Sequence, residues 1–231
     1  MSDDVIHMLK LFPLFRDLSN EELQLIKSLL RFKKYKKGTH IFMQEEPLSC
    51  IYFIKQGRVK IYKNDINGRV QIVNILTQGE MFPHQGFFRH SHYPANAEAM
   101  DELELFSLPI TSFESLLSEK PTLSVKLIYI LGNLIVDLQN RLEEQILHNS
   151  FEQIVMLLLR LGEKHGIPSH DDWIIINQPF SNQELANMIG SSRETVSRTL
   201  SQLKKQQAIK KEETGLLSIQ SDKLDQLLFV E

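Results

Sequence analysis

Hydrophobic and polar positions alternate with a period of two through much of the first half of the chain, after one short segment of helical period. In that first segment Ser19 and Glu22 form a capping box, which predicts a helix over residues 18–30. From Phe32 onward the apolar residues are largely Ile, Val, Tyr and Phe, the residues that favour strands. Glycines separate these strands at four places: Gly38, Gly57, Gly68 and Gly79. The pattern predicts an antiparallel β structure.

Two glycine turns suggest how the strands connect. Gln56-Gly57 separates a strand over 51–55 from one that begins at Val59, and Asn67-Gly68 precedes a strand over 70–76, so both sites are interpreted as hairpins. Later strands around 97–100 and 103–108 would complete a roll or barrel. We therefore expect a β-roll domain over residues 1–120, in which most apolar side chains form core.

A long amphipathic helix is predicted over residues 121–149, because apolar residues recur there at spacings of three and four. At 1.5 Å per residue such a helix is about 40 Å long, more than a small domain needs, so we expect its apolar stripe to pack against a second copy of the chain. A core helix inside one subunit is the alternative. The expected dimer interface consists of Leu127, Leu131, Leu134, Ile135, Leu138 and Leu142.

Residues 150–231 predict a second domain that contains a helix-turn-helix. Ser181 and Glu184 form a capping box at the start of one short helix, and Gly190 ends it. A second helix follows from about Arg193, and two short helices joined through glycine form a helix-turn-helix. The second helix buries one apolar face, made of Val196, Leu200 and Leu203.

The opposite face of this second helix carries Arg193, Glu194, Ser197 and Arg198. In a major groove, arginine recognises guanine O6 and N7, glutamate accepts a hydrogen bond from cytosine N4, and serine contacts a base or a phosphate. The alternative is an ordinary solvated surface in which Glu194 pairs with Arg198 four residues on.

Composition neither requires nor excludes a nucleic-acid partner. The chain has 231 residues, 42% of them hydrophobic and 24% charged. Its formal net charge is −3, so the chain as a whole is not basic and the charge of each segment has to be considered separately. A single cysteine, Cys50, excludes an internal disulfide and favours a reducing compartment. The N-terminal segment is acidic rather than basic, and no run of about 18 apolar residues offers a membrane span. We expect a cytoplasmic protein that does not contact a membrane.

The stretch IGSSRETVSRTLSQLKKQQAI, residues 189–209, resembles the recognition helix of the cyclic-AMP-receptor and FNR family of bacterial transcription regulators. The glycine-punctuated roll, the GEMF segment that begins at Gly79, the central helix and the C-terminal domain follow in the family's order. The resemblance implies an α+β fold: an N-terminal cyclic-nucleotide-binding-like β-roll (jelly roll), a dimerisation helix over 121–149 and a winged helix-turn-helix over 150–231. It implies a homodimer that binds an inverted-repeat operator and works with RNA polymerase, with control of anaerobic or fermentative metabolism as the expected role.

The resemblance also assigns residues to DNA contact. Glu194, Ser197 and Arg198 match the E-x-x-S-R pattern with which FNR-like members read a TGA-containing half-site. Thr214-Gly215 would form the tip of the wing. The complete set of expected DNA-binding residues is Ser192, Arg193, Glu194, Thr195, Ser197, Arg198 and Lys204, with Lys205, Lys210 and Lys211 as further neighbours of the DNA backbone.

The sequence departs from the family at the effector pocket. Pro83-His84-Gln85 replaces the Gly-Glu-Leu, and Pro94-Ala95 replaces the Arg-Ser, that hold a cyclic nucleotide. Because a buried phosphate without its arginine is poorly compensated, we do not expect tight cyclic-AMP binding. One cysteine also cannot supply an iron-sulfur cluster, so no cofactor is expected and the effector is unknown. The corresponding pocket positions are Gly79, Glu80, His84, Gln85, Gly86, Pro94 and Ala95.

Three histidines in the same loop, His84, His90 and His92, leave two other hypotheses open. They could bind a transition metal or respond to pH, and a metal would turn the roll into a cupin-like enzyme. No cysteine or close carboxylate completes a tetrahedral ligand set, so no metal is expected. The other alternative is a protein-interaction module without DNA contact. Cys50 is interpreted as a small buried hydrophobe rather than a redox thiol.

Overall fold

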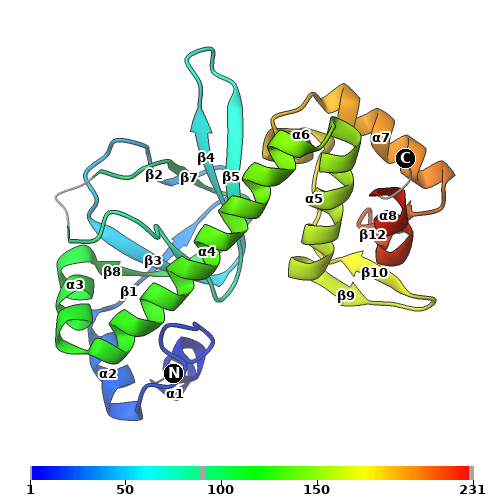
Figure 1. The fold of residues 1–231 in the computed structure, drawn as a ribbon. Coiled ribbons are helices and arrows are strands. Elements are labelled where there is room, and N and C mark those ends of the chain that lie inside the picture. Colours follow the sequence, from blue (N-terminus) through cyan, green and yellow to red (C-terminus); the bar gives the residue numbers. More distant parts are fainter. Residues whose placement is uncertain (1, 89–91, 229–231) are drawn as a thin grey trace. The chain divides into compact units, whose positions relative to one another are not determined.

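The chain folds into two compact units, Met1–Val136 and Asp137–Glu231, and the computed structural model describes residues 2–88 and 92–228. The boundary between the units lies inside one long helix, α4 (Pro121–Leu147). The sequence suggested a separate helical segment between two domains. In the structure, each half of α4 belongs to the unit that it adjoins (Figure 1).

In its described residues, the first unit contains eight strands. Helices cover them (Figure 1). The helices are α1 (Ser2–Leu9), α2 (Asn20–Leu29), α3 (Ile110–Glu119) and the first half of α4. The strands are β1 (Arg31–Tyr35), β2 (His40–Phe42), β3 (Cys50–Gln56), β4 (Val59–Asn64), β5 (Val70–Leu76), β6 (Met81–Phe82), β7 (Asn96–Ala99) and β8 (Leu103–Pro109). The capping box of Ser19 and Glu22 at the start of α2 is confirmed.

The strands form two antiparallel sheets, in the orders β1-β8-β3-β6 and β2-β7-β4-β5. Asn67-Gly68 is a hairpin turn as predicted, because β4 and β5 pair from Asn64 with Val70 to Val59 with Leu76. The prediction of a hairpin at Gln56-Gly57 is wrong. β3 and β4 belong to different sheets, so this turn carries the chain from one sheet to the other. A glycine is needed there, since Gly57 has φ +91° and a Cβ atom would lie 2.6 Å from the carbonyl oxygen of Glu102.

The crossing between the sheets is fastened by an ion pair between Arg58 and Asp101. The nearly buried guanidinium donates from Nε to Oδ2 at 2.5 Å and from Nη2 to Oδ1 at 2.8 Å. The same two segments are joined by a backbone hydrogen bond from Met100 to Arg58. The side-chain hydrogen bonds from Arg58, with its charge, hold the pKa of the Asp101 carboxyl below its usual range.

Two hydrophobic clusters stabilise the first unit. One lies between the sheets. The other joins the first sheet to the covering helices and includes Phe12, Phe15 and Phe53, whose rings touch one another, together with Leu123 and Leu127 from α4. Because α4 supplies core residues, its first half is an integral part of the first unit.

As far as residue 228, the second unit consists of five helical segments and a small sheet in the order β11-β12-β10-β9. Figure 1 labels these elements. Its helices, after the end of α4, are α5 (Ser150–His165), α6 (Asn182–Ile189), α7 (Arg193–Lys205) and α8 (Ser221–Leu228). Its strands are β9 (Gly166–Pro168), β10 (Trp173–Ile176), β11 (Ile209–Lys211) and β12 (Leu217–Gln220). One core cluster includes residues from α5, α6, α7, α8 and the sheet.

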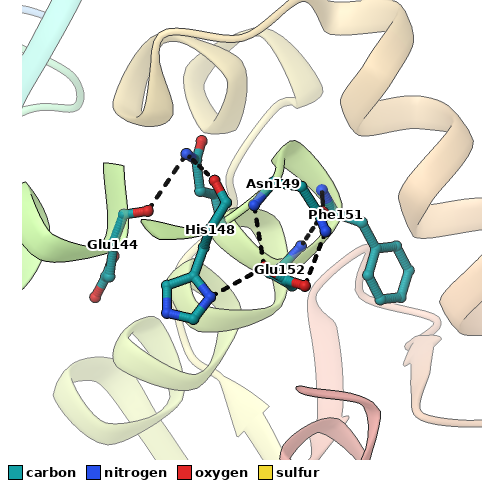
Figure 2. A network of polar contacts seen from close by, with 6 residues as sticks. Glu144, His148, Asn149, Phe151 and Glu152 are labelled. Carbon is teal, nitrogen blue, oxygen red and sulfur yellow. Dashed lines mark hydrogen bonds and ion pairs between the residues drawn. The ribbon is translucent and has the colours of Figure 1, made fainter. Parts of the chain in front are cut away.

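A polar network holds the corner between α4 and α5 (Figure 2). Asn149 caps α5, and Glu152 completes the capping box and accepts from His148 at 3.0 Å. The backbone and side chain of Asn149 and the side chain of His148 lower the pKa of the Glu152 carboxyl. Gln153 in α5 donates to the carbonyl of Glu144 in the last turn of α4 and to the carbonyl of His148, which follows that helix.

The fold class expected from the sequence, an α+β chain with a β-roll, a long helix and a winged helix-turn-helix, is confirmed. The expectation about membrane-spanning segments needs correction. Among the described residues, α4 is long and apolar enough by length and composition to cross a membrane, although polar residues interrupt its apolar ones. Part of α4 nevertheless packs in a protein core, through Leu123 and Leu127.

The Arg58–Asp101 pair leads to a stability prediction. We expect Asp101→Asn to lower the unfolding free energy by about 1 to 2 kcal/mol at pH 7, less than for a fully buried pair because Asp101 is partly exposed. Since the folded-state pKa is depressed, this difference is present above the ordinary carboxyl pKa and is lost as the pH falls through the folded-state pKa.

Urea unfolding of wild type and variant between pH 7 and the acid range measures the difference. The exposed neighbour Glu102, changed to Gln, is the control. A wild-type advantage that grows toward low pH would contradict the assignment.

Candidate nucleic-acid interface

The helix-turn-helix is built by local capping interactions, of which the sequence predicted those at Ser181 and Gly190. Ser181 and Glu184 form the capping box of α6, and Gly190 ends that helix in the left-handed conformation with φ 68°. Ser192 then caps α7, because its hydroxyl accepts from the backbone N–H of Thr195 at 3.0 Å. Only one residue, Ser191, separates the C-cap of α6 from the N-cap of α7, so the two helices are held in a tight turn.

One face of α7 is buried in the core of the second unit. Val196 and Leu203 are fully buried, Leu200 is nearly so, and Thr199 lies beside them. All expected DNA-binding residues on the helix lie outside this face. Thr195 is half-buried and the others are exposed: Ser192, Arg193, Glu194, Ser197, Arg198 and Lys204.

A short chain of hydroxyl groups runs along the first two turns of α7. Ser192 Oγ lies 3.0 Å from Thr195 Oγ1, and Arg198 Nη2 donates to the same Thr195 oxygen at 3.5 Å. Among the described ion pairs, none joins Glu194 to Arg198, which was the pairing expected for an ordinary solvated surface. The carboxylate of Glu194 and most of the guanidinium donors of Arg198 therefore remain available to another molecule.

An open depression of about 470 Å³ lies along the outward face of α7. It is lined by Ser197, Arg198 and Lys205, which the sequence analysis placed near DNA, and by two residues that it did not name, Ser201 and Gln202. Helical spacing could have found these two, because Ser201 and Gln202 lie three and four residues after Arg198.

The wing has the predicted form. β11 and β12 pair antiparallel, and Gly215 at the tip has φ 84°. Lys210 is partly engaged within the unit, because its ammonium lies 4.5 Å from the ring centroid of Trp173 and 3.4 Å from Glu212. The sequence did not show this contact, since Trp173 and Lys210 are far apart in the chain.

The expected effector-pocket residues lie around β6 and in the segment before β7. Gly79 and Glu80 make hydrogen bonds within the roll. The Gly79 N–H donates to the Ile54 carbonyl, and the Glu80 carbonyl accepts from the Ile54 N–H. The Glu80 carboxylate accepts from Thr77 N at 2.7 Å. His84 and Gly86 are half-buried, and Gln85 is exposed. Pro94 is half-buried and Ala95 is buried.

Four aromatic rings fill the roll next to these residues. Tyr93 stacks on Phe42 with centroids 3.7 Å apart, and Tyr52 stacks on Phe82 at 5.2 Å. The Tyr93 hydroxyl accepts from Cys50 N at 3.1 Å and donates to the Cys50 carbonyl at 3.2 Å. Burial, then hydrogen bonding with Tyr93, raises the pKa of Tyr52 far above its usual range. This part of the roll is packed with the chain's own side chains.

The described residues give little support to a metal site formed by the histidines. Within them, no three histidine, cysteine, aspartate or glutamate side chains are grouped to hold a metal ion. His84 is half-buried, His92 is exposed, and His90 lies outside the described residues. Cys50 has a free, half-buried thiol, and its backbone N–H donates to the Tyr93 hydroxyl.

The residues of the expected dimer interface lie on different faces of α4. Leu127 is buried in the core of the first unit and Leu131 packs against that core. Leu134 is half-buried. Ile135, Leu138 and Leu142 are between 55% and 60% exposed. Only these last three leave most of their apolar surface open.

Two family models match the chain. The cyclic nucleotide-binding domain matches residues 32–120, and the Crp-like helix-turn-helix domain matches residues 152–227. Together with the exposed polar face of α7, they define a DNA-binding transcription regulator with an N-terminal domain of the cyclic-nucleotide-binding type. The chain belongs to the family of the cyclic-AMP receptor protein and FNR, as its motifs predicted.

Individual relatives agree with this placement. The global nitrogen regulator of Synechococcus elongatus is 28% identical over 201 residues, which cover 86% of this chain and 88% of that protein. The anaerobic regulatory protein of Bacillus subtilis is 24% identical, covering 91% and 89%. The structure of FixK2 from Bradyrhizobium japonicum has the same fold, with a TM-score of 0.75 and 21% identity over 87% of this chain and 98% of that one. The family consists of transcription regulators, so the comparisons do not support an enzyme.

Proposed function

We propose that this protein binds an inverted-repeat operator as a homodimer and regulates transcription from it. The observation that carries the proposal is the division of α7: Val196, Leu200 and Leu203 are buried, while Glu194, Ser197 and Arg198 face outward. A base-reading helix needs this division, because a rigid apolar face must hold the helix while long polar side chains enter the major groove. Arg198 would recognise guanine, and Glu194 would accept from cytosine N4.

The proposed dimer uses one face of α4 that follows a heptad pattern. With Val125 as position a, every large exposed apolar side chain of the helix except Leu147 falls at a, d, e or g. These eight side chains are between 54% and 72% exposed, and we call them the exposed stripe: Val125, Ile128, Tyr129, Ile135, Val136, Leu138, Leu142 and Ile146. Positions c and f include residues that pack within the chain, such as Leu123 and Leu127.

The exposed stripe is large enough to drive association. Completing the burial of a half-exposed aliphatic side chain contributes about 1 kcal/mol, so eight on each of two helices contribute roughly 15 kcal/mol before costs. Association costs about 4 to 15 kcal/mol in lost motion. Gly132 occupies an a position within the stripe, and a Cβ there would meet no atom of its own chain within 4 Å. A glycine at that point permits two helices to approach closely.

A helix partner fits α4 better than lipid does. A membrane-spanning helix is apolar on all sides, whereas the exposed apolar residues of α4, except Leu147, lie on one side. On its other faces, Lys126 pairs with Asp17 at 2.7 Å and Glu144 pairs with Arg160. The proposed location is therefore the cytoplasm.

We also propose that the roll does not bind cyclic AMP tightly. Pro94 and Ala95 offer no positive charge to a cyclic phosphate, and the Phe42–Tyr93 stack occupies space inside the neighbouring roll. The relatives bear names that refer to nitrogen and to anaerobic regulation. We propose regulation of anaerobic or fermentative metabolism, in cooperation with RNA polymerase, as the role in the cell.

Arg198→Ala tests the DNA-reading role. We expect specific operator affinity to fall by about 1 to 3 kcal/mol, because a bidentate contact to guanine is lost and the folded dimer is unchanged. Fluorescence anisotropy with an operator selected from a random library measures the loss. Lys204→Ala is the comparison, and we expect it to weaken all duplexes similarly and to reduce the salt dependence. Unaltered operator preference in Arg198→Ala would refute the role.

The exposed stripe is tested by a double substitution, Ile135→Glu with Leu142→Glu. Four like charges in the seam should convert the dimer to monomers at micromolar concentration, seen by light scattering, and abolish specific binding. Asn140→Glu, on a different face of the same helix, is the control and should remain dimeric. A dimeric double variant would show that the chains associate elsewhere.

The effector proposal is tested by calorimetric titration of the dimer with cyclic AMP. We expect no saturable heat at ligand concentrations up to about 100 μM, because the roll offers no guanidinium at positions 94 and 95. Operator affinity with and without the nucleotide is the second measurement. Micromolar binding that also strengthens operator affinity would overturn the proposal.

A further inference from the structure

The depression on α7 continues past Arg198 toward the end of the helix, into a part to which the sequence assigned no base contact. Its last three lining residues are Ser201, Gln202 and Lys205, and all three are exposed. If α7 lies in the major groove, these side chains face the same DNA surface as Ser197 and Arg198. The chemical groups of the three residues determine what each of them can recognise there.

Ser201 and Lys205 have little capacity to distinguish bases. The Ser201 hydroxyl already donates to the carbonyl of Ser197 at 2.8 Å, so only its acceptor sites remain. Lys205 carries a flexible point charge at the end of a long side chain, which suits a phosphate.

Gln202 differs from both. Its carboxamide carries two donors and one acceptor in a plane, and no hydrogen bond from it to another side chain or carbonyl is found in the described part of the chain. A planar amide of this kind matches adenine, because it accepts from N6 and donates to N7 at the same time.

We propose that Gln202 is a specificity-determining residue that reads an adenine in each half-site; this rests on the proposed operator binding. Gln202 lies four residues beyond Arg198, about 6 Å further along the helix axis. Base pairs are about 3.4 Å apart, so this displacement corresponds to roughly two base pairs when the helix follows the groove. The adenine is therefore placed about two base pairs from the guanine that Arg198 reads.

The test compares full-length wild type with Gln202→Ala on a set of duplexes in which each position of the selected operator is changed in turn. We expect the wild type to prefer A·T at one symmetric pair of positions by about 5- to 150-fold, the range that corresponds to one good bidentate contact. In Gln202→Ala this preference should disappear at those positions while the preference for guanine two base pairs away remains.

Two further variants sharpen the result. Gln202→Glu should shift the preference at the same positions from adenine toward cytosine, since a carboxylate accepts from cytosine N4. Gln206→Ala is the matched control, because Gln206 is an exposed glutamine at the C-cap of the same helix that does not line the depression. It should leave all preferences unchanged.

The outcomes separate this inference from the proposed function. If the wild-type protein does not prefer a palindromic duplex over a random duplex, the proposed operator binding is refuted. A specific wild type whose base preferences are unchanged in Gln202→Ala would refute the role of Gln202 alone. A uniform loss of affinity for all duplexes would refute it as well, because that result identifies a contact to the DNA backbone.

Discussion

Burial of one face of α7 is the constraint on which the proposed DNA interface depends. Val196 and Leu203 are fully enclosed by the core of the second unit, so α7 cannot rotate about its axis without exposing them. The direction of Glu194, Ser197 and Arg198 is thereby set by side chains that have no role in recognition. Gly190 and the Ser192 cap complete the restraint, because they determine where the helix begins.

The long helix α4 shows how one element serves two purposes on different faces. Leu123 and Leu127 anchor it in the core of the first unit, and in the second unit Glu144 binds Arg160 while Gln145 donates to the carbonyl of Ile189. The residues of the exposed stripe make none of these contacts. The heptad spacing can be recognised only after the apolar residues of α4 that pack inside the chain are left out.

The sequence predicted best those features that depend on neighbouring residues. Capping boxes at Ser19 and Ser181, the helix end at Gly190 and the hairpin at Asn67-Gly68 all follow from local hydrogen bonding and backbone freedom, and the structure confirms them. Features that depend on distant partners were harder. Gln56-Gly57 has the composition of a hairpin, but β3 does not pair with β4. Its two edges are taken by β6 and β8, which come later in the chain.

The same limit applies to the candidate sites. Periodicity alone places Leu127 and Leu142 on one apolar stripe, and only tertiary contacts show that Leu127 is already enclosed. The outward residues of α7 were predictable because burial of Val196, Leu200 and Leu203 follows from a helical period. The aromatic packing around Tyr93 was not, because Phe42, Tyr52 and Phe82 come from three different strands.

The contact between Trp173 and Lys210 has a practical consequence. Trp173 is the only tryptophan of the chain, and it sits on the strand next to the wing with an ammonium group over its ring. Ultraviolet light that excites indole selectively therefore reports on a single place in the molecule. If a phosphate draws the Lys210 ammonium away from the ring, the emission wavelength and intensity of Trp173 fluorescence change. The intrinsic fluorescence of the protein therefore reports a phosphate contact at the wing.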